Sequence, residues 1–205
     1  MLPSMTTTSR TRRAEALRAA FGRLRAALPV AAPPTYVEPQ DDPAVAWQRR
    51  LDRVRAALEQ ARVDLVEQGW TQRAWFSVAV SGAPDGSGAG GTTRLASVAE
   101  SFDLVRPTSS VTGACLIGTL LRRADDPDRA TTHADVWGAV DELYEALHER
   151  MGHVSFPPGR VDSAARRHAK LRTLTAWNDD RATRREDVLD LLDRAVSRTL
   201  VGACR

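Results

Sequence analysis

The strongest constraint on the fold is a helical stripe of apolar residues between positions 43 and 68. Its members follow one another at alternating spacings of four and three residues: Trp47, Leu51, Val54, Leu58, Ala61 and Leu65. Such spacing places them on one face of an α-helix. Asp42 suits the N-cap, Pro43 the first helical position and Gly69 the end of the helix. The pattern predicts one long helix whose apolar face packs into a core; a coiled-coil seam with a partner helix is the alternative.

More helices are predicted downstream. Residues 109–124 are apolar nearly all round, which is typical of a central, buried helix. The segments 132–151, 162–177 and 183–201 each begin with a capping residue: Thr132, Asp162 and Thr183. Residues 75–80 and 92–98 could pair as two short strands, with an irregular loop as the alternative. The expected fold is mainly α, a compact bundle of about five helices with a small β-hairpin near 75–98.

The N-terminal 42 residues differ in composition from the rest of the chain. Residues 1–28 hold six arginines against one glutamate, so the net charge of +3 conceals a basic arm and a nearly neutral body. Residues 29–43 contain five prolines, which predicts a stiff, extended linker. We therefore divide the chain into a tethered basic amphipathic helix (1–28), a Pro-rich linker (29–42) and a helical domain (43–205).

Composition limits the class of protein. A chain of 205 residues with 42% hydrophobic and 27% charged residues is ordinary for a globular protein. No apolar run approaches the ~20 residues that span a bilayer, and the N-terminus lacks the apolar stretch of a secretory signal. The two cysteines, Cys115 and Cys204, do not make a disulfide framework. We expect a soluble protein of the reducing cytoplasm.

Four short motifs, in a fixed order and spacing, resemble those of an uncharacterised family of small bacterial and phage-encoded proteins. The motifs are Gly69-Trp-Thr-Gln72, Cys115-x-x-Gly118, Trp177-Asn-Asp179 and Val188-Leu-x-Leu-Leu-Asp-Arg-Ala195. The resemblance covers roughly residues 50–200. Thr119 stands where the family usually has alanine, and the stretch 76–108 is longer than in the family. The resemblance implies a helical domain with a helix–corner–helix at Trp177, and it implies no activity.

Cys115 is the candidate for covalent chemistry. A thiol near a helix N-terminus can have a lowered pKa and act as a nucleophile. His148 or His153 would then be the base, and Asn178 or Asp179 would orient it. The apolar neighbours of Cys115 favour the alternative, in which it is a small side chain buried in a packed helix.

The segment Trp177-Asn178-Asp179-Asp180 is a candidate binding corner. It could present carboxylates and an amide to a metal or substrate. The favoured interpretation is a helix cap, with Asn178 in the left-handed conformation and Trp177 packed into the core. The four histidines have no metal-ligand spacing, and the glycine-rich run 82–91 lacks the Lys-Ser/Thr of a phosphate loop. No metal or cofactor is therefore predicted.

The N-terminal arm offers candidate binding residues of two kinds, basic (Arg12, Arg13) and apolar (Leu17, Phe21, Leu24). It could contact nucleic-acid phosphates, lie on an anionic membrane, or dock into a partner's groove. Packing on its own domain or on a second copy is the alternative, and the apolar face favours packing or docking. We predict a non-enzymatic interaction or adaptor protein that binds another macromolecule through its N-terminal arm or its helical surface, with a protein partner favoured over nucleic acid. The alternatives are an acyl-transfer or hydrolytic enzyme using Cys115 and a DNA-associated regulator; a homo-oligomer is left open.

Overall fold

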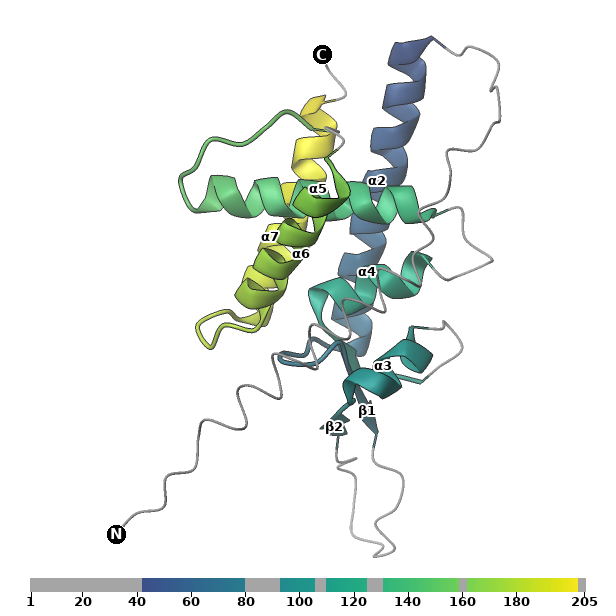
Figure 1. Cartoon of the computed structure of the whole chain (residues 1–205), viewed down its shortest axis with the longest axis vertical. Helices are drawn as coiled ribbons and strands as arrows, with labels where there is room; N and C mark the ends of the chain where they lie inside the picture. The colour runs from purple at the N-terminus through teal and green to yellow at the C-terminus, as the bar shows by residue number, and fades with distance from the viewer. Residues whose placement is uncertain (1–41, 80–92, 106–109, 125–130, 159–161, 203–205) are drawn as a thin grey trace, which may run out of the picture. The chain divides into compact units, whose positions relative to one another are not determined.

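The computed structural model describes residues 42–79, 93–105, 110–124, 131–158 and 162–202 (Figure 1). Within these ranges the chain is mainly helical, as predicted, with a small antiparallel sheet. The predicted arm and nearly all of the linker lie outside the described residues. The arm candidates Arg12, Arg13, Leu17, Phe21 and Leu24 therefore remain predictions from sequence.

Helix α2 (Pro43–Gln68) confirms the longest predicted helix. The Asp42 carboxylate accepts a hydrogen bond of 3.0 Å from the backbone N–H of Ala44, and Gly69 ends the helix at φ 95°. The predicted stripe is buried from Leu51 to Leu65, whereas Trp47, one turn earlier, is exposed. Because α2 packs against α4, α5 and α7 of the same chain, its apolar face belongs to the body's own core.

Helix α5 (His133–Arg150) runs across α2 in Figure 1. Thr132 and Asp135 form the predicted capping box at its start. The two helices approach closely at Gly138, where an added Cβ would lie 2.5 Å from Cγ2 of Val54. A residue without a side chain is therefore needed at the crossing.

Helices α6 (Ala164–Asn178) and α7 (Arg185–Gly202) confirm the last two predicted helices, but their predicted caps are wrong. Ser163 caps α6 by accepting from the backbone N–H of Arg166, while Asp162 pairs with Lys170 instead. At α7 the Asp187 carboxylate accepts from the N–H of Arg184, and the Thr183 hydroxyl donates to the carbonyl of Trp177. Each predicted cap lies next to the true start of its helix and is held by a tertiary contact.

Helix α4 (Leu116–Ala124) begins later than the predicted helix 109–124. The preceding residues form strand β3 (Gly113–Ala114), which pairs with β1 (Phe76–Ala79). Strand β2 (Thr93–Leu95) pairs with the other edge of β1, giving the order β2-β1-β3. The predicted hairpin is thus confirmed, and β3 was not predicted.

A short helix, α3 (Val98–Leu104), follows β2 and was also missed, although Ser97 and Glu100 form a capping box at its start. A small core of Phe76, Ala96 and Ala114 lies beside the sheet. None of the helices in the described ranges is long and apolar enough to cross a membrane.

Candidate functional site

Asn178, the last residue of α6, lies at the centre of a buried polar network. Its side-chain oxygen accepts from the indole N–H of Trp70 at 2.9 Å and from the backbone N–H of Leu116 at 3.4 Å. Its side-chain nitrogen donates to the Thr71 carbonyl at 3.4 Å and to Asp179 Oδ1 at 3.0 Å. Asn178 is 1% exposed, and both its amide oxygen and its amide nitrogen are hydrogen-bonded. Its side chain therefore joins the end of α6 to residues 70–71, which precede β1, and to the start of α4.

Gln72 also contacts this corner, the segment that joins α6 to α7. Its Nε2 donates to three carbonyl oxygens at 2.8–3.1 Å, those of Asn178, Asp180 and Thr183. Asp179 Oδ1 also accepts from the backbone N–H of Arg73 at 2.8 Å. The last carbonyl of α6 and two carbonyls of the turn before α7 are therefore bonded by one side chain, more than a hundred residues away in sequence.

The corner corrects two details of the predicted cap. The C-cap residue is Asp179, in a right-handed conformation with φ −90°, so Asn178 is not in the left-handed region. Trp177 is only partly buried, and the guanidinium of Arg150 lies 5.9 Å from the centre of one of its rings. The three proposed binding residues Trp177, Asn178 and Asp179 are thus engaged within the fold, because the corner joins three segments of the chain.

Cys115 immediately precedes α4 and is buried. Its Sγ accepts a hydrogen bond of 3.2 Å from the backbone N–H of Gly118. Burial raises the pKa of the Cys115 thiol to about 12, against the opposite influence of the backbone N–H groups of Gly118 and Ile117. The pKa is thus shifted away from the thiolate that nucleophilic catalysis requires.

The other proposed catalytic residues do not complete a triad around Cys115. His148 packs against the rings of Tyr144 and His153, at centroid distances of 4.3 and 5.1 Å. Asn178 does lie beside the start of α4, but its amide is engaged in the corner network. Within the described residues, no group of three His, Cys, Asp or Glu side chains could hold a metal ion.

Helix α5 carries an unexpected row of buried carboxylates: Asp135, Asp141, Glu142 and Glu145. Charged groups are costly to bury unless they are paired. Two of these, Asp141 and Glu145, surround Lys170 together with Asp162. The ammonium nitrogen lies 2.7 Å from Asp162 Oδ2, 2.9 Å from Glu145 Oε1 and 3.4 Å from Asp141 Oδ1. We call these four residues the Lys170 cluster.

Burial acts in opposite directions on the pKa values of Lys170 and Asp141. Burial lowers the pKa of Lys170, but hydrogen bonds to Asp162 and Glu145 and the charge of Asp141 outweigh it, so the pKa is raised overall. Burial raises the pKa of Asp141, although the charges of Lys170 and Arg167 oppose the shift. Lys170 is therefore a protonated cation at neutral pH, with no role as a free amine nucleophile.

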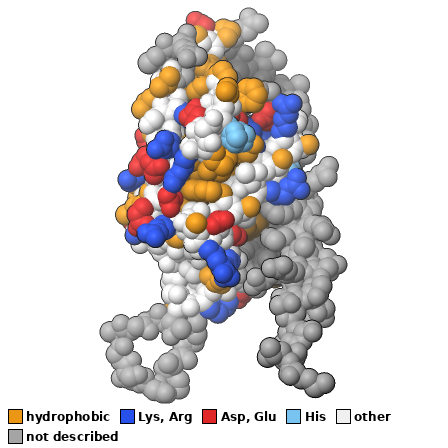
Figure 2. All heavy atoms as spheres, turned by 90° about the vertical axis from the view of Figure 1, so that its left-hand side faces the viewer, with side chains coloured by type: hydrophobic (Ala, Val, Ile, Leu, Met, Phe, Trp, Pro, Cys, Tyr) orange, Lys and Arg blue, Asp and Glu red, His pale blue; other side chains and the backbone are white. Residues whose placement is uncertain are grey.

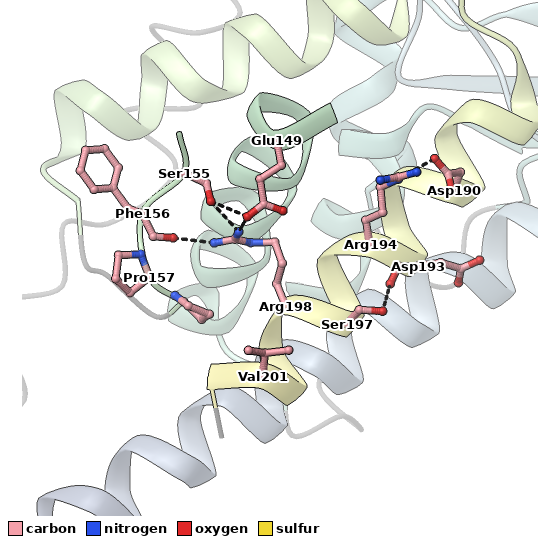
Figure 3. A pocket seen from close by; sticks show the side chains of 11 residues that line it. Glu149, Ser155, Phe156, Pro157, Asp190, Asp193, Arg194, Ser197, Arg198 and Val201 are labelled. Carbon is pink, nitrogen blue, oxygen red and sulfur yellow. Dashed lines mark hydrogen bonds and ion pairs between the residues drawn. The ribbon is translucent and has the colours of Figure 1, made fainter. Parts of the chain in front are cut away.

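Arg198 of α7 organises a second ionic cluster (Figure 3). Its Nε donates to Glu142 at 3.1 Å, and its Nη1 pairs with Glu149 and donates to the Ser155 hydroxyl at 3.0 Å. Its Nη2 donates to the carbonyl of Phe156 at 2.6 Å. Every guanidinium nitrogen of this buried arginine is therefore used inside the protein.

The two clusters hold the segment 151–158, which follows α5 and which we call the α5 loop. Arg198 bonds the carbonyl of Phe156, and Glu145 of the Lys170 cluster accepts from the backbone N–H of Phe156 at 3.0 Å. The loop nevertheless exposes apolar side chains: Val154 is 95% exposed, Phe156 53% and Met151 49%. Hydrophobic side chains gather among acidic and basic ones on this side of the molecule (Figure 2).

The α5 loop borders two cavities. The larger, of about 640 Å³, lies between the loop and α7, and we call it the α7 groove. Its lining comprises Glu149, Ser155, Phe156, Pro157, Pro158, Asp190, Asp193, Arg194, Ser197, Arg198 and Val201. The smaller, of about 360 Å³, includes Tyr144, His148, Phe156 and members of the Lys170 cluster. Phe156 lines both cavities, so the loop separates a surface groove from a partly buried ionic site.

Comparison with known proteins identifies the family. Residues 49–198 match a family of unknown function, DUF6197, and the chain belongs to this family. No curated protein and no solved structure matches the chain. The match confirms the resemblance to an uncharacterised family, and it extends from the second turn of α2 to Arg198.

Proposed function

Starting from a family with no assigned activity, we propose that this chain is a non-enzymatic interaction protein that binds a protein partner in the cytoplasm. The binding surface is the α5 loop together with the α7 groove. The observation that carries the proposal is the combination of exposed apolar side chains with a backbone held by buried ionic groups.

Exposed apolar side chains are common singly, but here they adjoin a groove and lie on one short loop. Phe156, Pro157 and Pro158 line the groove from the loop side, and Val201 lines it from α7. Aromatic side chains in well-packed pockets often supply much of the energy of protein–protein binding. The arrangement suits a partner that places an apolar side chain against Phe156.

Preorganisation adds to the argument. A loop that is ordered only on binding loses conformational entropy, which reduces affinity. The α5 loop has the backbone of Phe156 bonded on both sides, to Glu145 and to Arg198. Little ordering cost is therefore expected when a partner covers it.

The enzyme alternative has less support. Burial of Cys115 and its raised thiol pKa both disfavour a nucleophile, and His148 packs elsewhere. The N-terminal arm, with Arg12, Arg13, Leu17, Phe21 and Leu24, is a second candidate binding element on its sequence alone. A DNA-associated regulator would use the arm, and its binding would weaken steeply with salt.

The test is affinity capture from the native host's lysate, quantified by mass spectrometry. Full-length protein is compared with Phe156→Ser and with a matched control, Leu95→Ser, which changes a similarly exposed apolar residue on β2. We expect Phe156→Ser to lose at least about tenfold of a specifically captured protein, because loss of a central anchor costs about 2 kcal/mol or more and tenfold corresponds to about 1.4 kcal/mol. The Leu95→Ser protein should retain it.

Two outcomes would argue against the proposal. Equal capture by both variants would mean that the loop is not the binding surface. A partner captured by the full chain but lost on removal of residues 1–41, with Phe156→Ser unaffected, would move the function to the arm.

A further inference from the structure

Arg50 of α2 is a partly buried arginine without a partner. Its guanidinium makes no hydrogen bond and no ion pair with any other residue that the structure describes. The residues one turn away on α2 offer it no carboxylate: they are Ala46, Trp47, Arg53 and Val54. Withdrawing a charge from water is costly unless the charge is paired. The position therefore has a positive charge that the described part of the chain leaves uncompensated.

Two further guanidinium groups lie close to Arg50. Arg53, one turn along α2, has its Nε 3.1 Å from Asp135 Oδ1. Arg167 of α6 donates from Nε and Nη2 to Asp141 Oδ2, at 3.2 and 3.1 Å. Both carboxylates belong to α5, which packs against α2 and against α6. We call Arg50, Arg53 and Arg167 the arginine cluster.

The charges around the arginine cluster do not balance. Burial lowers the pKa of Arg50 and so does the charge of Arg167, whereas the charges of Asp141 and Asp135 raise it. An arginine nevertheless stays protonated at neutral pH. Asp135 is paired with Arg53 and Asp141 with Arg167, so neither carboxylate is left over for Arg50. The excess positive charge of the cluster therefore lies at Arg50.

The arginine cluster also has unused hydrogen-bond donors. A guanidinium group has N–H donors on three nitrogens, and Arg50 uses none of them within the described residues. Arg53 uses Nε alone, and Arg167 uses Nε and Nη2. The side chains of Arg53 and Arg167 are 49% and 17% exposed, and Arg50 is partly exposed as well. A ligand in solvent can therefore reach free N–H groups of all three arginines.

We propose that the arginine cluster binds the phosphate of a small molecule, either free phosphate or a phosphate monoester. Arg50 makes the principal contact, and the free Nη groups of Arg53 and Arg167 add further donors. Guanidinium and phosphate groups pair through short, charge-assisted and often bidentate hydrogen bonds. None of the three arginines lines the α7 groove, so this site goes beyond the proposed function and is independent of it.

A tetrahedral phosphate suits the arginine cluster better than a carboxylate. A carboxylate presents two oxygens in one plane, and one guanidinium fork can bond both. A phosphate monoester presents three strong acceptor oxygens in different directions and carries up to two negative charges. Donors that come from two helices, α2 and α6, can therefore bond different oxygens of one phosphate, whose charge offsets that of Arg50.

The test measures thermal unfolding of the full-length protein while inorganic phosphate replaces sodium chloride at constant ionic strength. A ligand that binds the folded state raises the unfolding midpoint as its concentration rises. We expect the wild-type midpoint to rise by about 3 °C or more at about 20 mM phosphate, as for a Kd of roughly 2 mM or lower. Sodium acetate at the same ionic strength should leave the midpoint unchanged.

Two variants separate binding at Arg50 from general salt effects. Arg50→Gln removes the unpaired guanidinium, and Arg55→Gln removes one from the same helix that is already paired with Asp52. The two variants have the same net charge, so the general stabilising effect of phosphate acts on both alike. Arg50→Gln should lose most of the phosphate-induced shift, whereas Arg55→Gln should retain it.

The same variants test whether Arg50 has only a structural role. In sodium chloride alone, Arg50→Gln should unfold at a midpoint no lower than the wild type, because the charge it removes has no partner. A lower midpoint in sodium chloride combined with an unchanged phosphate-induced shift would overturn the proposal. An equal loss of the shift in Arg50→Gln and Arg55→Gln would overturn it too.

Further probes identify the source of the phosphate. Glycerol 3-phosphate presents the group on a small molecule, and an oligonucleotide of about ten thymidines presents it in a polymer. An Arg50-dependent shift with inorganic phosphate or glycerol 3-phosphate supports the proposal, and the larger shift shows which of the two sources fits. Arg50-dependent binding of the oligonucleotide without a shift from either small molecule, or an equal shift with acetate, would contradict it.

Discussion

At the scale of single residues, Lys170 is the least expected feature. It is the only lysine in a chain with 29 lysines and arginines, and it lies buried among three carboxylates. A compact ammonium can direct its three N–H groups to three separate acceptors, whereas a guanidinium presents a flat fork. In a chain whose other basic residues are arginines, the single lysine therefore lies where the geometry of the acceptors favours it.

Replacing Lys170 by methionine should destabilise the protein strongly. Asp141, Glu145 and Asp162 would then lose their shared cation, with Arg167 still paired to Asp141 and Arg166 to Asp162. Breaking a buried ion pair costs about 3–5 kcal/mol. The free energy of unfolding of both proteins, measured in urea at about pH 8, gives the difference. A loss below ~1 kcal/mol would show that the cluster contributes little.

The same pair of proteins tests the pKa of Lys170. Because that pKa is raised above 10.5 in the folded state, its stabilising contribution is complete below pH 10.5 and is lost as pH rises through the folded value. The stability difference between the wild type and Lys170→Met should therefore shrink as the pH rises above 10.5. A difference that stays constant to higher pH would contradict the assignment.

Cys115 should be inert in the native protein. With a thiol pKa of about 12, the thiolate fraction at pH 7 is on the order of 10⁻⁵, against about 3% for an ordinary cysteine. We expect iodoacetamide to label Cys115 only after denaturation, as measured by mass spectrometry of the peptide that contains it. Rapid native labelling would restore the catalytic hypothesis.

At the scale of elements, features set by neighbouring residues were predicted correctly, whereas features that depend on tertiary contacts were not. The stripe in α2 and the Thr132 cap of α5 depend on neighbouring residues, so sequence reveals them. The late start of α4 depends on pairing between β3 and β1, which are separated by more than thirty residues. The buried carboxylates of α5 look like an exposed face in sequence, because their arginine and lysine partners lie on other helices, α2, α6 and α7.

The α6–α7 corner depends on Gln72. Replacing it by glutamate would remove the donor and place a carboxylate against three carbonyl oxygens. We expect a loss of about 1–2 kcal/mol, since three partly exposed acceptors lose their donor and a carboxylate is placed against them. Urea unfolding of the wild type and the Gln72→Glu protein measures the difference.

A Gln72→Glu protein as stable as the wild type would show that the bonds of Asn178, Asp179 and Thr183 hold the corner without Gln72. Two of the four motifs on which the resemblance was based, Gly69-Trp-Thr-Gln72 and Trp177-Asn-Asp179, meet at this corner. Their meeting explains the motifs as structural, and it leaves the binding surface to be sought elsewhere in the chain.

At the scale of the whole described body, the candidate site combines segments that sequence keeps apart. The α7 groove joins residues 149–158 to residues 190–201 through Arg198, and no sequence motif connects these two segments. Neither Phe156 nor Arg198 was predicted as a site residue from the sequence. A phenylalanine in a loop or an arginine on a helix can be recognised as part of a site only from its tertiary contacts. Sequence could therefore predict the bundle but not its groove.

The most direct test of the central claim is hydrogen–deuterium exchange of the full chain, alone and with the protein that it captures from lysate. We predict slower exchange in residues 149–158 and 190–201 of the complex, and no change in residues 93–105 around β2 and α3. Slower exchange confined to residues 93–105, or to residues 1–41, with the groove unchanged, would contradict the claim that the α5 loop and the α7 groove form the binding surface.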